Sequence, residues 1–71
     1  MKILALDTST KVSGYAVFNN KELIRYSSID KSDKTDSYDR MSAMVYEITT
    51  LIEREAPDVV IIEETVVTRN P

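Results

Sequence analysis

The sequence predicts one α/β domain with a mixed sheet and a single crossover helix, and three observations support this fold class. Two short apolar runs, residues 3–6 and 59–62, have the length of strands and are too short for helices. Residues 12–29 are rich in β-branched and aromatic side chains and contain an asparagine pair typical of a hairpin turn. Residues 38–52 carry apolar side chains at helical spacing, which indicates an amphipathic helix.

The first three strands are expected at residues 3–6, 12–18 and 21–29. Asn19-Asn20 is expected to join the second strand to the third, because asparagine tolerates the positive φ that a two-residue turn needs. The third strand should therefore return antiparallel to the second. Residues 30–36 follow as a polar loop.

A helix of about five turns is expected next, with Asp36 or Ser37 as its N-cap, because both side chains accept a hydrogen bond from a free helix amide. Pro57 is expected to end this helix, since proline lacks the amide proton and disfavours helical geometry at Ala56. The helical side chains expected in the core are Tyr38, Met41, Met44, Val45, Ile48, Leu51 and Ile52.

The last apolar run, residues 59–62, is expected to form a buried parallel strand. The right-handed crossover rule places it beside the first strand, which gives a βββαβ element order and the strand order 3-2-1-4. Such a strand needs neighbours on both edges and cover on both faces, whereas one helix covers only one face. Residues 1–71 are therefore expected to be a single partial, truncated domain. We expect a homodimer or higher self-association, through the free strand edge or the helix face.

Composition limits the chemistry that the chain can perform. It has no cysteine and no histidine, which excludes disulfides and Cys/His zinc sites and leaves oxygen ligands, with Mg²⁺ or Mn²⁺ as the expected metal. Nine basic and twelve acidic residues give a net charge of −3, which offers nucleic acid no basic face. The sequence contains no signal-peptide core or membrane span, so we expect a cytoplasmic protein without a membrane partner.

Two carboxylates follow the two apolar runs directly, Asp7 after the first and Glu63 after the second. If the two strands are parallel neighbours, both acids lie roughly 5 Å apart at the sheet edge where open α/β sheets place their ligands. Glu63 is expected to be partly buried, because large aliphatic residues precede it, and Glu64 should face the other side. The repulsion between two such carboxylates would be relieved by a hard divalent ion, or by an ion pair to Lys11 or Arg69.

The turn after Asp7 is rich in hydroxyl groups, from Thr8, Ser9 and Thr10. These hydroxyls can hydrogen-bond the carboxylate, a metal-bound water or a phosphate oxygen; alternatively, this is an ordinary polar turn in which Asp7 accepts from local amides. Gly14 is the only glycine and lies inside the second predicted strand. It either admits substrate near the acids or relieves packing against the helix.

Three parts of the sequence stand out together: Ile3-Leu4-Ala5-Leu6-Asp7, Ser13-Gly14-Tyr15-Ala16-Val17, and Pro57-Asp58 leading into Ile62-Glu63 with Arg69-Asn70 beyond. These segments resemble the RuvC family of Holliday junction resolvases, within the ribonuclease H-like superfamily. The resemblance spans the whole chain but only half of the family domain, and it implies a ribonuclease H-like fold. An aspartate after the first strand is weakly specific, whereas the tract from residue 57 to residue 70 is more specific.

The resemblance implies a metal-dependent endonuclease that resolves four-way DNA junctions by phosphodiester hydrolysis and works as a homodimer. Two Mg²⁺ or Mn²⁺ ions would be bridged by Asp7, and Glu63 would bind one of them. The family's other two metal-binding acids lie in a late helix and have no counterpart before Pro71, so this chain alone is expected to cleave poorly or not at all. The residues expected to contact substrate are Thr8, Ser9, Gly14, Val66, Arg69 and Asn70, with Val66 at a position where family members often carry an aromatic residue.

Two other interpretations remain open. Residues 3–24 also resemble actin-like and sugar-kinase-like nucleotide-binding half domains, including tRNA threonylcarbamoyl modification proteins that open with a similar Asp-Thr-Ser run. Those proteins do not need Glu63, and they usually place glycine-rich turns where this chain has none. The third interpretation is a non-catalytic assembly module in which Asp7 and Glu63 are only polar residues at the rim of the sheet.

Overall fold

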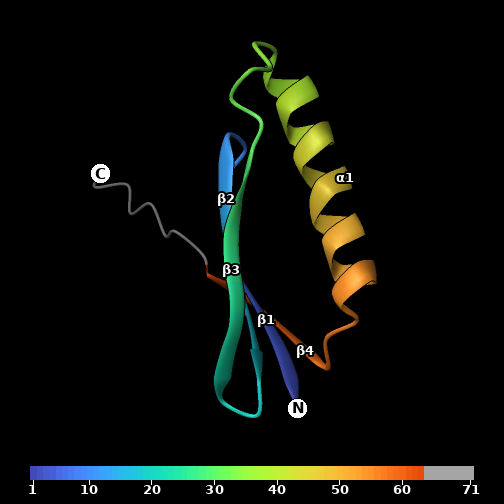
Figure 1. Ribbon diagram of the computed structural model, residues 1–71. Coiled ribbons are helices and arrows are strands. Elements are labelled where there is room, and N and C mark those ends of the chain that lie inside the picture. Colours follow the sequence, from blue (N-terminus) through green and yellow to red (C-terminus); the bar gives the residue numbers. More distant parts are fainter. Residues whose placement is uncertain (64–71) are drawn as a thin grey trace, which may run out of the picture.

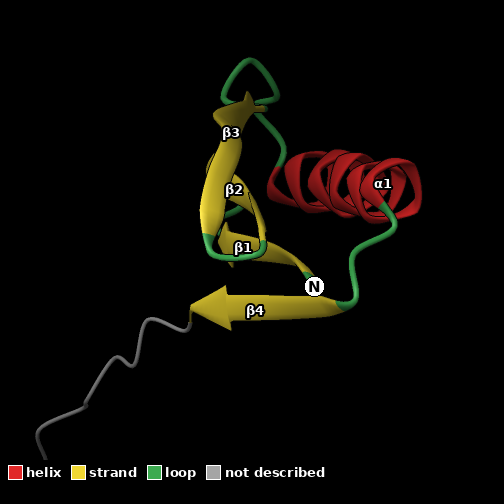
Figure 2. Cartoon of the chain, turned by 60° about the horizontal axis from the view of Figure 1, so that its bottom comes forward, coloured by secondary structure: helices red, strands yellow, loops and turns green. Residues whose placement is uncertain are grey.

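The computed structural model describes residues 1–63, which form a four-stranded mixed sheet with one helix on one of its faces (Figures 1 and 2). The strand order is β3-β2-β1-β4, with β2 antiparallel to both of its neighbours, β1 and β3, and β4 parallel to β1. This confirms the predicted order and the crossover through the helix. The elements are β1 (Lys2–Asp7), β2 (Val12–Asn19), β3 (Glu22–Asp30), α1 (Ser37–Glu55) and β4 (Val59–Glu63).

The turn between β2 and β3 consists of Asn20 and Lys21, one residue later than predicted. Both residues have positive φ, 52° and 71°, as the tightest hairpin turns require. Asn19 stays in the strand because it pairs with Lys2 of β1. Asn20 is also held by the first residue of the chain, since its amide donates to the Met1 carbonyl and its side-chain oxygen accepts from the Met1 ammonium at 2.7 Å.

Both predicted ends of α1 are confirmed. The Asp36 side chain accepts a hydrogen bond of 2.8 Å from the Tyr38 amide and so acts as the N-cap. Ala56 leaves the helix in the left-handed conformation, with φ 46° and ψ 54°, and its amide donates to the Ile52 carbonyl. Pro57 follows and prevents a further helical turn.

The hydrophobic core lies between α1 and the face of β1 and β2 that the helix covers. Leu4 and Leu6 of β1, Val17 of β2 and Leu51 of α1 are buried against one another. The partly buried side chains around them are Tyr15, Ile29, Ile48 and Ile52. Alternate residues of β1 therefore face α1, and the intervening ones face away from it.

The predicted burial of β4 is wrong, because all five of its residues are exposed. No residue of β4 belongs to the hydrophobic core, and among residues 1–63 no strand pairs with its outer edge. β1 is its sole described neighbour, so the strand is parallel as predicted but lacks the cover that a buried parallel strand normally has.

Part of the predicted helical core is also exposed. Met44 and Leu51 are buried, but Tyr38, Met41 and Val45 are 70%, 49% and 59% exposed. α1 meets the sheet along the line of Met44, Leu51 and the buried Glu55, so the neighbouring stripe of apolar side chains points away from it. No helix in the described part of the chain is long and apolar enough to cross a membrane.

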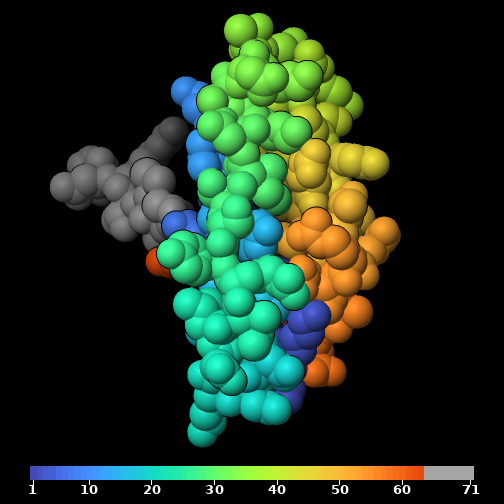
Figure 3. All heavy atoms as spheres, in the orientation of Figure 1, coloured from blue at the N-terminus to red at the C-terminus, as the bar shows by residue number. Residues whose placement is uncertain are grey.

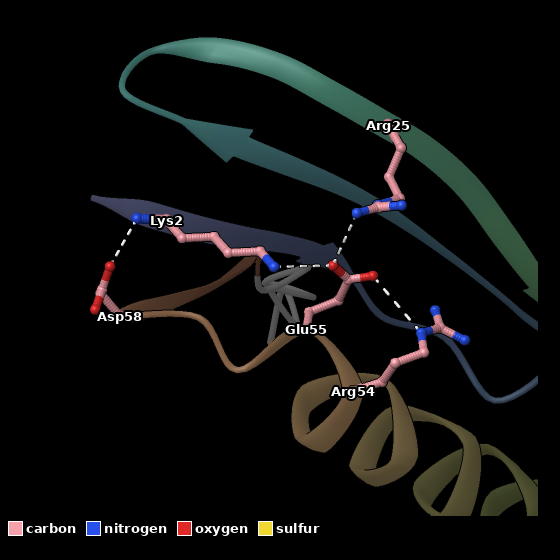
Figure 4. A network of polar contacts seen from close by, with 5 residues as sticks. All are labelled: Lys2, Arg25, Arg54, Glu55 and Asp58. Carbon is pink, nitrogen blue, oxygen red and sulfur yellow. Dashed lines mark hydrogen bonds and ion pairs between the residues drawn. The ribbon is translucent and has the colours of Figure 1, made fainter.

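Glu55, at the end of α1, is a buried carboxylate that the sequence analysis did not identify. Its side chain is 5% exposed and lies 3.2 Å from Lys2 Nζ, 3.4 Å from Arg25 Nη2 and 3.6 Å from Arg54 Nε (Figure 4). In the space-filling view, the start of the chain lies between β3 and the last turn of α1 (Figure 3). A buried charge requires such partners, so this cluster fixes the helix end to β1 and β3.

Burial raises the pKa of Glu55, but the hydrogen bond from Lys2 and the charges of Arg25, Lys2 and Arg54 outweigh it, so the pKa lies below its ordinary value of 4.5. A carboxyl with a lowered folded-state pKa contributes stability that is fully present above about pH 4.5 and is lost as the pH falls through the lower value.

We predict that Glu55→Gln lowers the free energy of unfolding at pH 7, because three cations lose their shared partner. The variant should also lose less stability than the original chain between pH 4.5 and pH 3. The contribution from Asp30 stays, since hydrogen bonds from Ser32 lower its pKa in both proteins. Urea unfolding at several pH values measures both effects. Identical pH dependence of the two proteins would contradict a role for the buried carboxylate.

We also predict self-association of the 71-residue chain, because among residues 1–63 the outer edge of β4 has no strand partner and residues 59–62 are consecutive exposed aliphatic side chains. Light scattering coupled to size exclusion should give a dimer or larger species. Ile62→Lys places a charge on β4, and Val45→Lys places one on the exposed stripe of α1, so the variant that yields monomers identifies the surface. A monomeric original chain at high micromolar concentration would refute the prediction.

Candidate metal site at the carboxyl ends of β1 and β4

Asp7 and Glu63 are the last residues of two neighbouring parallel strands, and they are register partners. Neighbouring strands lie about 4.8 Å apart, and register partners present their side chains on the same face. The predicted juxtaposition of these two acids is therefore present in the structure.

The two acids lie on the sheet face opposite α1. Asp7 follows the buried Leu6 and so points the other way, and its antiparallel partner in β2 is Gly14. Gly14, Asp7 and Glu63 thus form a row across three adjacent strands. The row borders an open depression of about 290 Å³, lined by Ala5, Leu6, Asp7, Gly14, Tyr15, Ala16, Ile61 and Glu63.

Gly14 does not relieve packing against the helix, so that interpretation is wrong. A Cβ built on Gly14 has no heavy atom within 4 Å, and the residue faces away from α1. The absence of a side chain instead leaves open space directly beside Asp7. This is the outcome expected if Gly14 gives a substrate access to the carboxylates.

Neither carboxylate is engaged by the rest of the described chain. Within residues 1–63, the side chains of Asp7 and Glu63 accept no hydrogen bond and form no ion pair, so Asp7 does not cap the following turn and Lys11 does not neutralise the pair. Glu63 is exposed rather than partly buried, because no element within residues 1–63 covers the outer side of β4. Arg69, the other predicted partner, lies outside the described residues.

The turn after Asp7 is held by Ser13, a buried residue that the sequence analysis did not single out. Ser13 Oγ accepts from the Ser9 amide at 3.0 Å and donates to the Ser9 carbonyl at 2.9 Å. Ser9 Oγ in turn accepts from the Lys11 amide at 3.4 Å. A single serine in a strand could not be recognised from the sequence as important, because its role depends on the Ser9 backbone, which the turn brings back to it.

The hydroxyl-rich turn does not line the depression that borders Asp7 and Glu63. Thr8, Ser9 and Thr10 instead border a second hollow of about 300 Å³, whose other walls are Met41, Met44, Val45 and Ile48 of α1. The structure thus brings Asp7, Glu63 and Gly14 together, and places Thr8 and Ser9 beside the helix. The other predicted contact residues, Val66, Arg69 and Asn70, lie outside residues 1–63, as does Glu64.

The donor set fits Mg²⁺ or Mn²⁺ in part. Mg²⁺ is commonly bound through one or two carboxylates, with water and substrate phosphates completing its octahedral shell. Asp7 and Glu63 supply two such oxygen ligands on an open surface. Within residues 1–63 no group of three or more metal-binding side chains is assembled, so Asp7 and Glu63 are the two carboxylates that the described chain brings together here.

Neighbouring positions of β2 should respond oppositely to alanine. We predict that Ser13→Ala costs about 1–2 kcal/mol in the free energy of unfolding, since it removes both hydrogen bonds to Ser9. Gly14→Ala should be neutral or stabilise by about 0.5 kcal/mol, because its new methyl group enters open space and glycine is unfavourable within a strand. Urea titration measures both changes; a clear loss of stability in Gly14→Ala would show that the space is needed by the fold.

Comparison with known proteins identifies no relative: no family model, no curated protein and no solved structure matches this chain.

Proposed function

We propose that this chain is the amino-terminal part of a divalent-metal-dependent DNA endonuclease of the RuvC kind, which resolves four-way junctions by phosphodiester hydrolysis. The observation that carries the proposal is the register pairing of Asp7 with Glu63 at the carboxyl ends of β1 and β4. Open α/β sheets place ligand sites at this position. The sequence segments that resemble the family surround the same two residues.

The two carboxylates bind and orient the reacting groups in this proposal. Asp7 lies between Gly14 and Glu63 in the row of three, which suits the bridging role that the resemblance implies for it. Glu63 adds a second charge on the outer strand, and the space above Gly14 leaves room for a phosphate group. Divalent ions held by Asp7, Glu63 and the further acids would supply the activation of a water molecule and the stabilisation of the leaving oxygen.

The described chain is not a complete nuclease in this proposal. Two further acids complete the metal site of the family, and basic surface must hold the DNA, since the net charge of this chain is −3. The intact enzyme would act as a homodimer on the symmetric strands of a junction. The 71-residue chain alone is therefore expected to bind metal but to cleave DNA poorly or not at all.

We predict that Mn²⁺ stabilises the chain through Asp7 and Glu63. At ten times its dissociation constant, Mn²⁺ should raise the free energy of unfolding by about 1.4 kcal/mol, because it binds the folded state. The gain should disappear in Asp7→Asn and in Glu63→Gln. Glu53→Gln, which removes an exposed acid from α1, is the matched control and should keep the full response.

A thermal-shift assay measures the gain with Mn²⁺ in these variants, and it also distinguishes the other two functions. A gain with ATP at constant Mg²⁺, unaffected by Glu63→Gln, would favour the nucleotide-binding half domain, whose ligand would lie near the turn at residues 8–10. No response to metal or nucleotide, with Asp7→Asn changing only the stability, would favour a non-catalytic assembly module. Either result contradicts the nuclease proposal.

A further inference from the structure

We propose that Asp58 is a positioning residue for the metal site: its contacts with the backbone of Lys2 set the register of β4 against β1 and so place Glu63 beside Asp7. The part of this inference that concerns metal rests on the proposed function. The part that concerns register stands on the hydrogen bonds of the described chain alone.

Asp58 holds Lys2 at two points, immediately before the paired segments begin. The Lys2 amide donates to Asp58 Oδ2 at 2.7 Å, and the Asp58 amide donates to the Lys2 carbonyl at 2.8 Å. Figure 4 shows the Asp58 side chain directed at the Lys2 backbone nitrogen, while the Lys2 side chain extends to Glu55. From this clamp the register runs without a shift from Ile3↔Val59 to Asp7↔Glu63.

The side chains of β4 specify its register weakly. Residues 59–62 are Val-Val-Ile-Ile, and all four are exposed, so few packing contacts tell one position from another. A shift by two residues leaves an aliphatic side chain at most positions of each face, because the side-chain period of a strand is two. With no partner on the outer edge among residues 1–63, the contact at the strand start is the most specific one that β4 makes.

A small error in register would separate the two acids. Each residue of a parallel strand advances about 3.3 Å, so a shift by two residues moves Glu63 about 6.6 Å along the strand direction and away from Asp7. A shift by one residue turns Glu63 to the α1 side of the sheet. Asp58 itself lies five residues before Glu63, about 16 Å away, and so cannot ligate the same ion. Any effect of Asp58 on metal binding must therefore pass through the position of β4.

The register of β4 against β1 can be measured by disulfide formation between introduced cysteines, which requires no metal. The chain contains no native cysteine that could form competing disulfides. In Ala5→Cys/Ile61→Cys the two thiols are register partners and should form a disulfide on oxidation. Ala5→Cys/Val59→Cys and Ala5→Cys/Glu63→Cys report shifts by two residues in either direction. We expect Asp58→Ala to increase shifted disulfides severalfold and Asp58→Asn, which keeps an acceptor oxygen, to restore much of the original pattern.

The matched control is Asp36→Ala, which removes the N-cap of α1. Like Asp58→Ala, it deletes one carboxylate that accepts a hydrogen bond from a backbone amide. It should lower stability but leave the disulfide pattern unchanged. In proteins without added cysteine, Asp58→Ala should weaken Mn²⁺ binding about tenfold by isothermal calorimetry, while Asp36→Ala should keep the original affinity. If Asp58→Ala does not fold, Asp58→Ser supplies the same two measurements.

The inference is overturned if Asp58→Ala keeps the original disulfide pattern, whatever its Mn²⁺ affinity. It is also overturned if register shifts but Mn²⁺ affinity in the variant equals that of the original chain. Failure of the original chain to bind Mn²⁺ would instead remove the proposed function, and the disulfide pattern would still decide whether Asp58 sets the register.

Discussion

The parallel pairing of β1 with β4 is the constraint on which the account of this protein depends. It joins the two ends of the described chain, closes the crossover through α1 and places two carboxylates side by side. Polar contacts at the start of both strands hold it: Asp58 binds the Lys2 backbone, and Glu55 binds the Lys2 side chain. The apolar core gives little direct support to β4, because its residues come from β1, β2 and α1. The contacts at Lys2 therefore determine whether Asp7 and Glu63 lie side by side at the opposite end of the two strands.

This arrangement leaves much apolar surface uncovered. The exposed aliphatic side chains of β4 and the stripe of Tyr38, Met41 and Val45 on α1 lie outside a small core. Burial of such side chains is the main favourable term in folding, and a chain of this size gains little of it alone. The same openness leaves Asp7 and Glu63 accessible on the sheet face opposite the helix. Further chain or another copy that covers β4 would stabilise the fold and could add groups to the site.

Strand order, the N-cap at Asp36 and the pairing of Asp7 with Glu63 could be predicted because they follow from local patterns and from the handedness of the crossover. The turn at Asn20 and Lys21 could not, since its position depends on pairing between β2 and the first residues of the chain. The exposure of β4 was missed because an aliphatic run indicates burial only when covering elements are present. Glu55 and Ser13 were missed because their partners are specified by tertiary structure rather than by spacing.

Paramagnetic broadening by Mn²⁺ in amide NMR spectra tests the central claim most directly, because it locates the bound ion without requiring catalysis. At substoichiometric Mn²⁺, we expect the strongest broadening at Gly14, Asp7 and Glu63, which lie in one row across β2, β1 and β4. The acidic loop that contains Asp33 is the natural competitor for a divalent ion. Broadening centred on that loop, or no localised broadening, would contradict a metal site at the carboxyl ends of β1 and β4.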